Sequence, residues 1–184
     1  MPGRLQPGVH YARLESDLSR EKTSQILHVL ERPDILTALQ RNKIESVAFR
    51  RLLGKAYSAY YDSDTKAISV NTARKLGVHY GETFEPGQTG NMSAATLDKQ
   101  ESIRRALLHE LAHHFETNNA EVAAIRDAAF ADPQRCPITR YAGSDASEYF
   151  AESLAAYVVE PRALCNYDPA GSMMIEKVLA AVGK

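Results

Sequence analysis

Hydrophobic residues near the start of the chain recur every three or four positions, as they do on one face of a helix. Between residues 11 and 31 this spacing, carried mainly by leucine and isoleucine, predicts an amphipathic helix that ends at Pro33. A short second helix is expected over 34–40, with Asp34 as its N-cap. We therefore expect residues 1–42 to form an N-terminal helical segment.

The apolar pattern then changes to one typical of strands. Residues 43–49 form one such run, and two β-branched or aromatic runs at 57–61 and 67–70 flank an Asp- and Ser-rich turn. This arrangement is typical of a β-hairpin. A short helix over 71–76 is expected next, followed by a polar, glycine-punctuated loop through Met92.

The rest of the chain carries helical patterns almost to its end. Strands that precede a run of helices are typical of an α+β fold. We expect residues 43–184 to form one domain, in which a small antiparallel or mixed sheet is followed by a helical C-terminal half. The predicted helices are 98–117, 120–131, 147–159 and a last one that begins at Asp168-Pro169.

Charge and composition exclude several classes of protein. The 184 residues carry 22 Lys+Arg and 23 Asp+Glu, a net charge of −1 that gives no support for binding to nucleic acid or to a membrane surface. No apolar run approaches the roughly 18 residues that span a bilayer. Two cysteines, Cys136 and Cys165, make neither a disulfide framework nor a cysteine-type zinc site. The first residues lack the apolar region of a Sec signal peptide.

One motif on the long predicted helix carries chemistry, the HExxH sequence His109-Glu110-Leu111-Ala112-His113. Residues four apart on a helix project from one face about 40° apart, so both imidazoles can bind one Zn²⁺. Glu110 lies at the flank of that face, where its carboxylate can take a proton from a zinc-bound water. Leucine, alanine and phenylalanine cover the opposite face of the helix and predict that it is buried.

The third zinc ligand is expected downstream, because a hydrolytic site has three protein ligands and one open position for water. The metzincin pattern is rejected, since Glu116 and Asn119 stand where it requires glycine and histidine. Glu148 and Glu152 lie one turn apart on a largely apolar predicted helix. We favour Glu148 as ligand and Glu152 as the hydrogen-bond partner of a ligand histidine. The reverse assignment stays open, as does an exposed glutamate pair without a role in the site.

A tyrosine seven residues before Glu148 completes a recognisable set. Tyr141 can donate its O–H to the oxyanion of a tetrahedral intermediate, although nine tyrosines in the chain make any single one ambiguous. The HExxH motif, Glu116 three residues beyond it, Tyr141, and Glu148-Tyr-Phe-Ala-Glu152 together resemble the catalytic domain family of anthrax lethal factor and the bacterial Pro-Pro endopeptidases. The resemblance covers roughly residues 43–184.

This resemblance implies a zincin-like fold and a zinc metallopeptidase of the gluzincin type. It also implies that the edge strand of the hairpin pairs with an extended substrate. Ala112 replaces a glycine that is frequent in the family, and residues 132–137 are distinct, so family substrate preferences are not transferred. The implied roles are His109, His113 and Glu148 as zinc ligands, Glu110 as general base, Tyr141 as oxyanion donor, and Glu152 as the carboxylate behind a ligand histidine.

The function expected from sequence is that of a zinc-dependent endopeptidase, in which Glu110 assists the attack of zinc-bound water on a peptide bond. The resemblance favours a bacterial toxin or effector protease, secreted or injected without a Sec signal, and a location in the cytoplasm stays open. We expect the protein to act as a monomer on a protein or peptide substrate. Three alternatives stay open: a non-catalytic zinc-containing binding module, another zinc hydrolase, and a helical domain with a chance HExxH.

Overall fold

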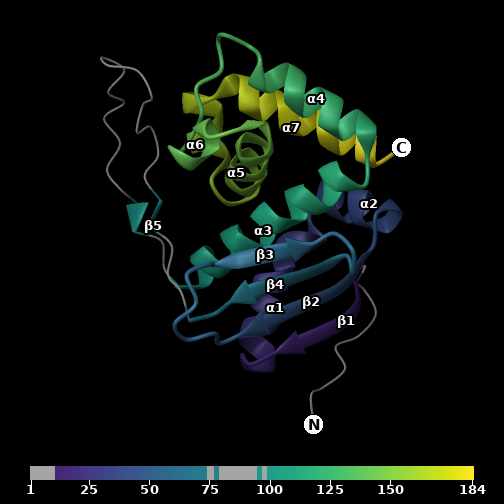
Figure 1. The fold of residues 1–184 in the computed structure, drawn as a ribbon, viewed down its shortest axis with the longest axis vertical. Coiled ribbons are helices and arrows are strands. Elements are labelled where there is room, and N and C mark those ends of the chain that lie inside the picture. The colour runs from purple at the N-terminus through teal and green to yellow at the C-terminus, as the bar shows by residue number, and fades with distance from the viewer. Residues whose placement is uncertain (1–10, 74–76, 79–94, 97–98) are drawn as a thin grey trace.

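The structure, a computed structural model, describes residues 11–73, 77–78, 95–96 and 99–184. Its central element is the long helix α3 (Lys99–Thr117), which has a sheet on one side and a group of helices on the other (Figure 1). The described residues combine this small mixed sheet with mostly helical structure. The expected α+β class is therefore confirmed.

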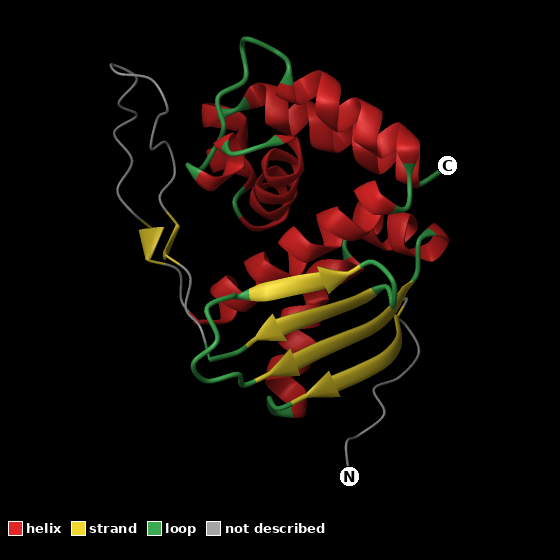
Figure 2. Ribbon diagram, viewed as in Figure 1, coloured by secondary structure: helices red, strands yellow, loops and turns green. Residues whose placement is uncertain are grey.

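The strands of the main sheet are β1 (Tyr11–Ser16), β2 (Ile44–Arg50), β3 (Ala59–Asp62) and β4 (Ala67–Asn71). They lie in the order β1-β2-β4-β3 (Figure 2). The pairs β1·β2 and β2·β4 are parallel, whereas β3 and β4 form the expected antiparallel hairpin. The hairpin thus places β3 at an edge of the sheet, where both β3 and β4 contact α3.

Residues 11–16 form strand β1, so the helix predicted over 11–31 is wrong in its first part. Tyr11 pairs with Ile44 and Ser16 with Phe49, in parallel register. The spacing of Leu14 and Leu18 fits a helix, but Leu14 is one of the alternating strand positions and packs against the core. Three further elements follow β1: α1 (Arg20–Leu27), the 3-10 turn η1 (His28–Glu31) and α2 (Pro33–Arg41).

Two local details of this segment also differ from expectation. Pro33 begins α2 instead of closing the preceding helix, and Arg32, not Asp34, occupies the N-cap position. Proline is well suited to the first turn of a helix because the N–H that it lacks has no partner there. Asn71 ends strand β4 and residues 72–73 form a turn, so the first half of the short helix expected over 71–76 is not present. Its second half, residues 74–76, lies outside the described residues, as does the polar loop through Met92.

The helices expected in the C-terminal half are present, together with one that was not predicted. Residues 161–167 form that extra helix, which also begins with a proline.

None of the helices in the described part of the chain is long and apolar enough to cross a membrane. The elements are α4 (Ala120–Phe130), the 3-10 turn η2 (Tyr141–Gly143), α5 (Ala146–Val159), α6 (Pro161–Tyr167) and α7 (Pro169–Val182). A short antiparallel pair joins β5 (Gly77–Val78) to β6 (Ala95–Thr96).

The main hydrophobic core surrounds α3. Its apolar face is fully buried, and each large side chain there contributes about 1.5–3 kcal/mol through removal from water. Helix α5 packs against α3 from the side opposite the sheet, and among the described residues no other pair of elements makes a more extensive contact. The polar residues His109 and Glu110 of the HExxH motif lie on another side of α3 and line a pocket next to β3. The buried apolar positions of α3 are Ile103, Ala106, Leu107, Leu108, Leu111, Ala112 and Phe115.

Candidate metal centre

Three side chains from two helices meet at one point beside α3. His109 and His113 project from consecutive turns of α3, and Glu148 reaches them from the first turn of α5. Their nearest ligand atoms all lie within 4.8 Å of one another. The two Nε2 atoms are 3.3 Å apart, and Glu148 Oε2 is 3.0 Å from one and 3.9 Å from the other. Ligand atoms bound to one tetrahedral zinc at about 2.0–2.1 Å lie about 3.3 Å apart, so this spacing suits a metal.

The carboxylate of Glu148 supplies a further observation that fits a metal. Its Oε2 atom is buried and has no hydrogen-bond partner among the described residues, although His109 Nε2 is only 3.0 Å away. A buried acceptor without a donor costs about 1–3 kcal/mol. A cation held between Oε2 and the two imidazole nitrogens would satisfy all three atoms. The donor set, two histidines and one carboxylate, can thus hold a metal ion.

His109 is oriented from behind by Glu152. Its Nδ1 lies 3.0 Å from Glu152 Oε1, which leaves Nε2 directed at the candidate metal position. The other oxygen of Glu152 accepts from Arg105 at 3.0 Å and from Thr139 at 2.9 Å. Burial tends to raise the pKa of Glu152, but Arg105 and His109 lower it to about 2, so this carboxylate stays ionised. The structure therefore brings Glu152 to the place that the sequence assigns to it.

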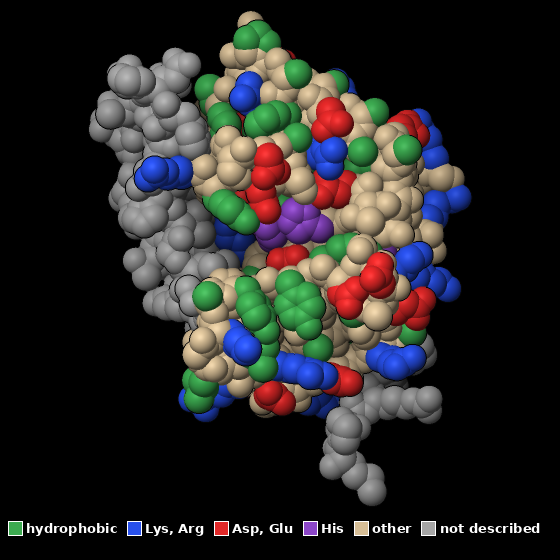
Figure 3. Space-filling model, in the orientation of Figure 1, with side chains coloured by type: hydrophobic (Ala, Val, Ile, Leu, Met, Phe, Trp, Pro, Cys, Tyr) green, Lys and Arg blue, Asp and Glu red, His purple; other side chains and the backbone are tan. Residues whose placement is uncertain are grey.

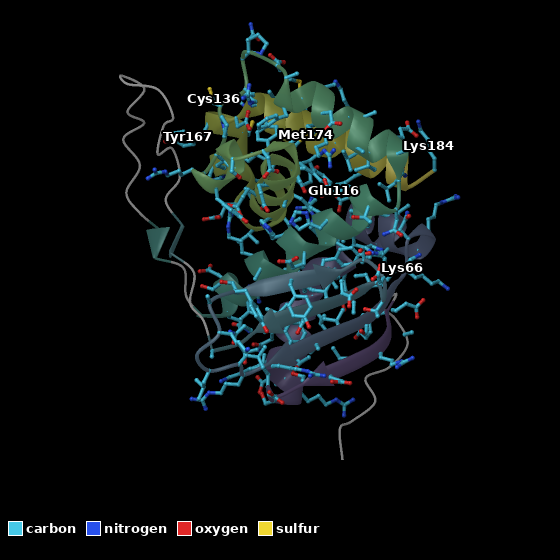
Figure 4. The ribbon with its side chains drawn as sticks, viewed as in Figure 1. Lys66, Glu116, Cys136, Tyr167, Met174 and Lys184 are labelled. Carbon is cyan, nitrogen blue, oxygen red and sulfur yellow. The ribbon has the colours of Figure 1, made fainter. Side chains whose placement is uncertain are left out.

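His113 has a carboxylate of its own, Glu116, one turn further along α3. His113 Nδ1 lies 2.9 Å from Glu116 Oε1. Glu116 also accepts from the Ser147 hydroxyl and, at 2.5 Å, from the Arg126 guanidinium. These bonds hold its pKa below the usual range against the opposing effect of burial. Figure 4 marks Glu116 where α3 meets the helical group, so this one side chain connects α4 and α5 to His113, a candidate metal ligand.

Without a metal the two carboxylates near His109 keep its imidazole protonated. Burial by itself lowers the pKa of His109, but the adjacent carboxylates of Glu148 and Glu152 outweigh burial and raise that pKa to about 10. A proton on Nε2 thus occupies the direction in which a metal would bind. Metal binding at this site must displace that proton.

Glu110 lies at the flank of the metal position, as the HExxH spacing predicts. Its side chain is buried, and burial raises the pKa of its carboxyl, an effect partly offset by the positive charges of His109 and His113. A carboxyl group with a raised pKa is better matched to taking up and releasing a proton near neutral pH. The geometry and the electrostatics of Glu110 both suit a general base.

Tyr141 comes to the site from the turn η2, between α4 and α5. Its O–H donates to Glu148 Oε1 at 2.9 Å, and its ring stacks on that of His109 with centroids 5.9 Å apart and planes 15° from parallel. The side chain is 56% exposed, so burial does not fix it in place. Burial and the neighbouring Glu148 raise its pKa to about 12, which keeps the phenol protonated and able to donate.

A cleft of about 290 Å³ opens beside these groups, between the edge strand β3 and the turn that carries Tyr141. Figure 3 shows histidine side chains in a hollow between the sheet half and the helical half, bordered by acidic side chains. Glu110 and His109 form part of the cleft wall, so a molecule in the cleft would lie against the candidate metal position. The remaining lining residues are Tyr57, Ser58, Ala59, Arg105, Ala106, Tyr141 and Glu152.

Sequence reasoning missed four polar side chains that hold these carboxylates. Arg105 and Thr139 bind Glu152, while Arg126 and Ser147 bind Glu116. Two of them left a signal: Arg105 lies four residues before His109 on the same face of α3, and Ser147 directly precedes Glu148. Thr139 and Arg126 left none, because only the packing of separate elements brings them near. Cys136 and Cys165 are free and exposed, and neither belongs to the metal-ligand group.

No protein-family model matches this chain, and no curated protein matches it either. The fold and the site nevertheless define a class: a small α+β protein with a candidate centre in which two histidines and one glutamate can hold a metal ion.

Proposed function

We propose that this protein is a zinc-dependent endopeptidase with a zincin-like fold. The observation that carries the proposal is the convergence of His109, His113 and Glu148 next to a cleft whose wall includes a buried carboxylate, Glu110. Two imidazoles and one carboxylate form a ligand set typical of hydrolytic zinc sites. The resemblance of the motif to the gluzincin family points the same way.

The proposed mechanism assigns one task to each residue. His109, His113 and Glu148 would hold the zinc ion, which when bound would supply the Lewis acidity that polarises a carbonyl and lowers the pKa of water to about 7. Glu110 accepts the proton released as the scissile carbonyl is attacked and then delivers it to the leaving amine. Tyr141 donates its O–H to the oxyanion, and for this step it must exchange Glu148 Oε1 for the substrate oxygen.

A protein or peptide is the substrate that the surroundings of the site support best. Strand β3 lies at the edge of the sheet, next to the cleft, and an edge strand presents unpaired main-chain groups to an extended peptide. On the strength of the motif resemblance we propose a bacterial toxin or effector protease, secreted or injected, that acts as a monomer.

A non-catalytic zinc module is the main competing function. Structural zinc sites are usually closed by four protein ligands, whereas the ligand group among the described residues has three. A cleft beside a three-ligand site leaves space for water and substrate. This geometry favours hydrolysis over a purely structural role.

The decisive experiment combines metal analysis with cleavage of a peptide library. We expect one zinc per chain in the wild-type protein and in Glu110→Gln, and cleavage by the wild-type protein alone. Glu110→Gln removes the charge that accepts the proton but preserves size, so its fold and zinc content serve as the control. Zinc without cleavage in the wild-type protein would favour the binding module, and equal cleavage by both proteins would exclude the proposed role of Glu110.

A further inference from the structure

A buried threonine connects the turn that carries Tyr141 to the carboxylate that orients His109. Thr139 is 5% exposed, and its side chain makes two hydrogen bonds. Its Oγ1 donates to Glu152 Oε2 at 2.9 Å and accepts from the backbone N–H of Ala142 at 3.0 Å. One hydroxyl group thus joins two parts of the site that come from separate elements, η2 and α5.

The bond to Glu152 controls how this carboxylate faces the histidine. Oε2 accepts from both Thr139 and Arg105, which leaves Oε1 for His109 Nδ1 at 3.0 Å. Rotation of the carboxylate would break these bonds together. The Thr139 hydroxyl therefore helps to fix the ring of a ligand histidine from the side opposite the metal.

The hydrogen bond from the backbone N–H of Ala142 to Thr139 affects the position of Tyr141. Ala142 is fully buried and follows Tyr141 directly in η2, so the hydroxyl of Thr139 anchors the backbone of this turn. Tyr141 is mostly exposed, and its ring is positioned by the turn and by its contacts with His109 and Glu148. A displaced turn would move the phenol relative to the metal ligands.

We propose that Thr139 is a positioning residue that sets the Tyr141 phenol relative to the ligand His109. This inference rests on the proposed function for its effect on catalysis, but its effect on His109 is independent of peptide cleavage. Thr139 itself lies behind Glu152 and η2. It acts on His109 through Glu152 and on Tyr141 through η2, and both effects depend on hydrogen bonds of the Thr139 hydroxyl.

The test replaces the hydroxyl while keeping the shape of the side chain. Thr139→Val should lower kcat about 10- to 100-fold with little change in KM, and should weaken zinc binding measured by chelator competition. Thr139→Ser keeps the hydroxyl and should restore both values to near wild type. Thr23→Val is the matched control, because Thr23 is equally buried and hydrogen-bonded but lies in α1, and it should leave both values unchanged.

A double-mutant cycle with Tyr141→Phe tests the connection itself. If Thr139 acts through the phenol, the loss in kcat for the double variant should be clearly smaller than the product of the two single losses. Fully multiplicative losses would overturn the proposal, as would a Thr139→Ser variant as impaired as Thr139→Val. If circular dichroism shows that Thr139→Val is unfolded, Thr139→Ala takes its place in every comparison.

A measurement on the metal-free protein separates this inference from the proposed function. In ¹H–¹⁵N spectra of histidine-labelled protein, the Nδ1–H resonance of His109 should shift in Thr139→Val and return in Thr139→Ser. Such a shift in a protein that cleaves no peptide would support the hydroxyl's effect on His109 while the proposed function fails. An unchanged resonance and unchanged zinc affinity in Thr139→Val would reject the role of Thr139 whether or not the protein is a peptidase.

Discussion

The phenol of Tyr141 donates to Oε1 of Glu148 at 2.9 Å, while Oε2 of the same carboxylate faces His109 at 3.0 Å. The two oxygens of Glu148 therefore have different contacts: Oε1 accepts from the phenol, and Oε2 faces the candidate metal position. This division favours coordination through a single oxygen. It also holds the phenol at the border of the site, where Tyr141 is one of the residues that line the cleft.

Tyr141→Phe should therefore affect catalysis much more than metal binding. We expect kcat to fall about 10²- to 10³-fold, the usual loss when one oxyanion donor is removed, with KM within a fewfold of wild type. Zinc affinity should fall less than tenfold, because Glu148 Oε2 and both histidines remain. Steady-state kinetics and chelator competition measure the two effects. A Tyr141→Phe enzyme with wild-type kcat would remove Tyr141 from the mechanism.

Substitutions of Glu148 and Glu152 should affect zinc binding to different degrees, because we propose Glu148 as a metal ligand and Glu152 as the hydrogen-bond partner of His109. Glu148→Ala removes a ligand atom, and atomic absorption should find the zinc lost after dialysis. Glu152→Gln leaves all three ligand atoms, and its zinc affinity should fall only about 10- to 100-fold. Glu121→Ala, at an exposed position of α4, is the control and should retain wild-type affinity. Zinc retention by Glu148→Ala would indicate the reverse assignment.

Much of the arrangement of the candidate site could be predicted from residue spacing within single helices. The four-residue interval between His109 and His113 fixes their relative direction wherever a helix forms, and the same interval relates Glu148 to Glu152. The partners Thr139 and Arg126 could not be predicted, because their contacts join segments that only the tertiary fold brings together. Local geometry thus suggested the ligands, and long-range packing supplied the groups that hold them.

For the fold too, elements with a local sequence signal could be predicted, whereas elements defined by long-range pairing could not. The β3–β4 hairpin and helix α3 carry strong local signals, and both were expected. Strand β1 was not, since its pairing with β2 is parallel and is reached through two intervening helices, so no turn marks it in the sequence. Helix α6 was missed because Pro161 ends one helix and begins the next, and only the first of these was recognised.

Substitution of Gly171 by alanine should destabilise the protein, although helix propensity alone predicts the opposite. Alanine is favoured over glycine within helices by about 0.5–1 kcal/mol. A Cβ at Gly171 in α7 would, however, lie 2.4 Å from Asp168 Oδ2 and 3.1 Å from Ser153 Oγ. Asp168 cannot easily move, because its Oδ1 accepts from the backbone N–H groups of Gly171 and Cys136.

Gly171→Ala should therefore lower the free energy of unfolding by about 1–3 kcal/mol, the usual cost of overpacking. Urea denaturation followed by circular dichroism gives the value. Ser172→Ala, one residue further along the same helix, should change stability by less than about 0.5 kcal/mol. A stabilised Gly171→Ala protein would show that Asp168 has room to relax.

The protonation of His109 gives a pH prediction that distinguishes the metal-free and metal-loaded proteins. Its pKa is raised to about 10 in the metal-free fold, above the value of about 6.5 in an unfolded chain. A raised folded-state pKa contributes stability that is complete below pH ~6.5 and is lost as the pH rises through ~10. The metal-free protein should therefore lose stability steadily between about pH 7 and pH 10. Zinc on Nε2 removes this proton, so the zinc-loaded protein should lack that contribution.

Two measurements check this prediction. Chelation of zinc at pH 8 should be accompanied by uptake of about one proton per chain at His109, seen by calorimetry in buffers of different ionisation enthalpy after the proton balance of the chelator is subtracted. Urea denaturation across pH 7–10 should show the decline in the metal-free protein only. Parallel curves for both forms, together with no proton uptake, would mean that Glu148 and Glu152 do not hold a proton on His109 when the metal is absent.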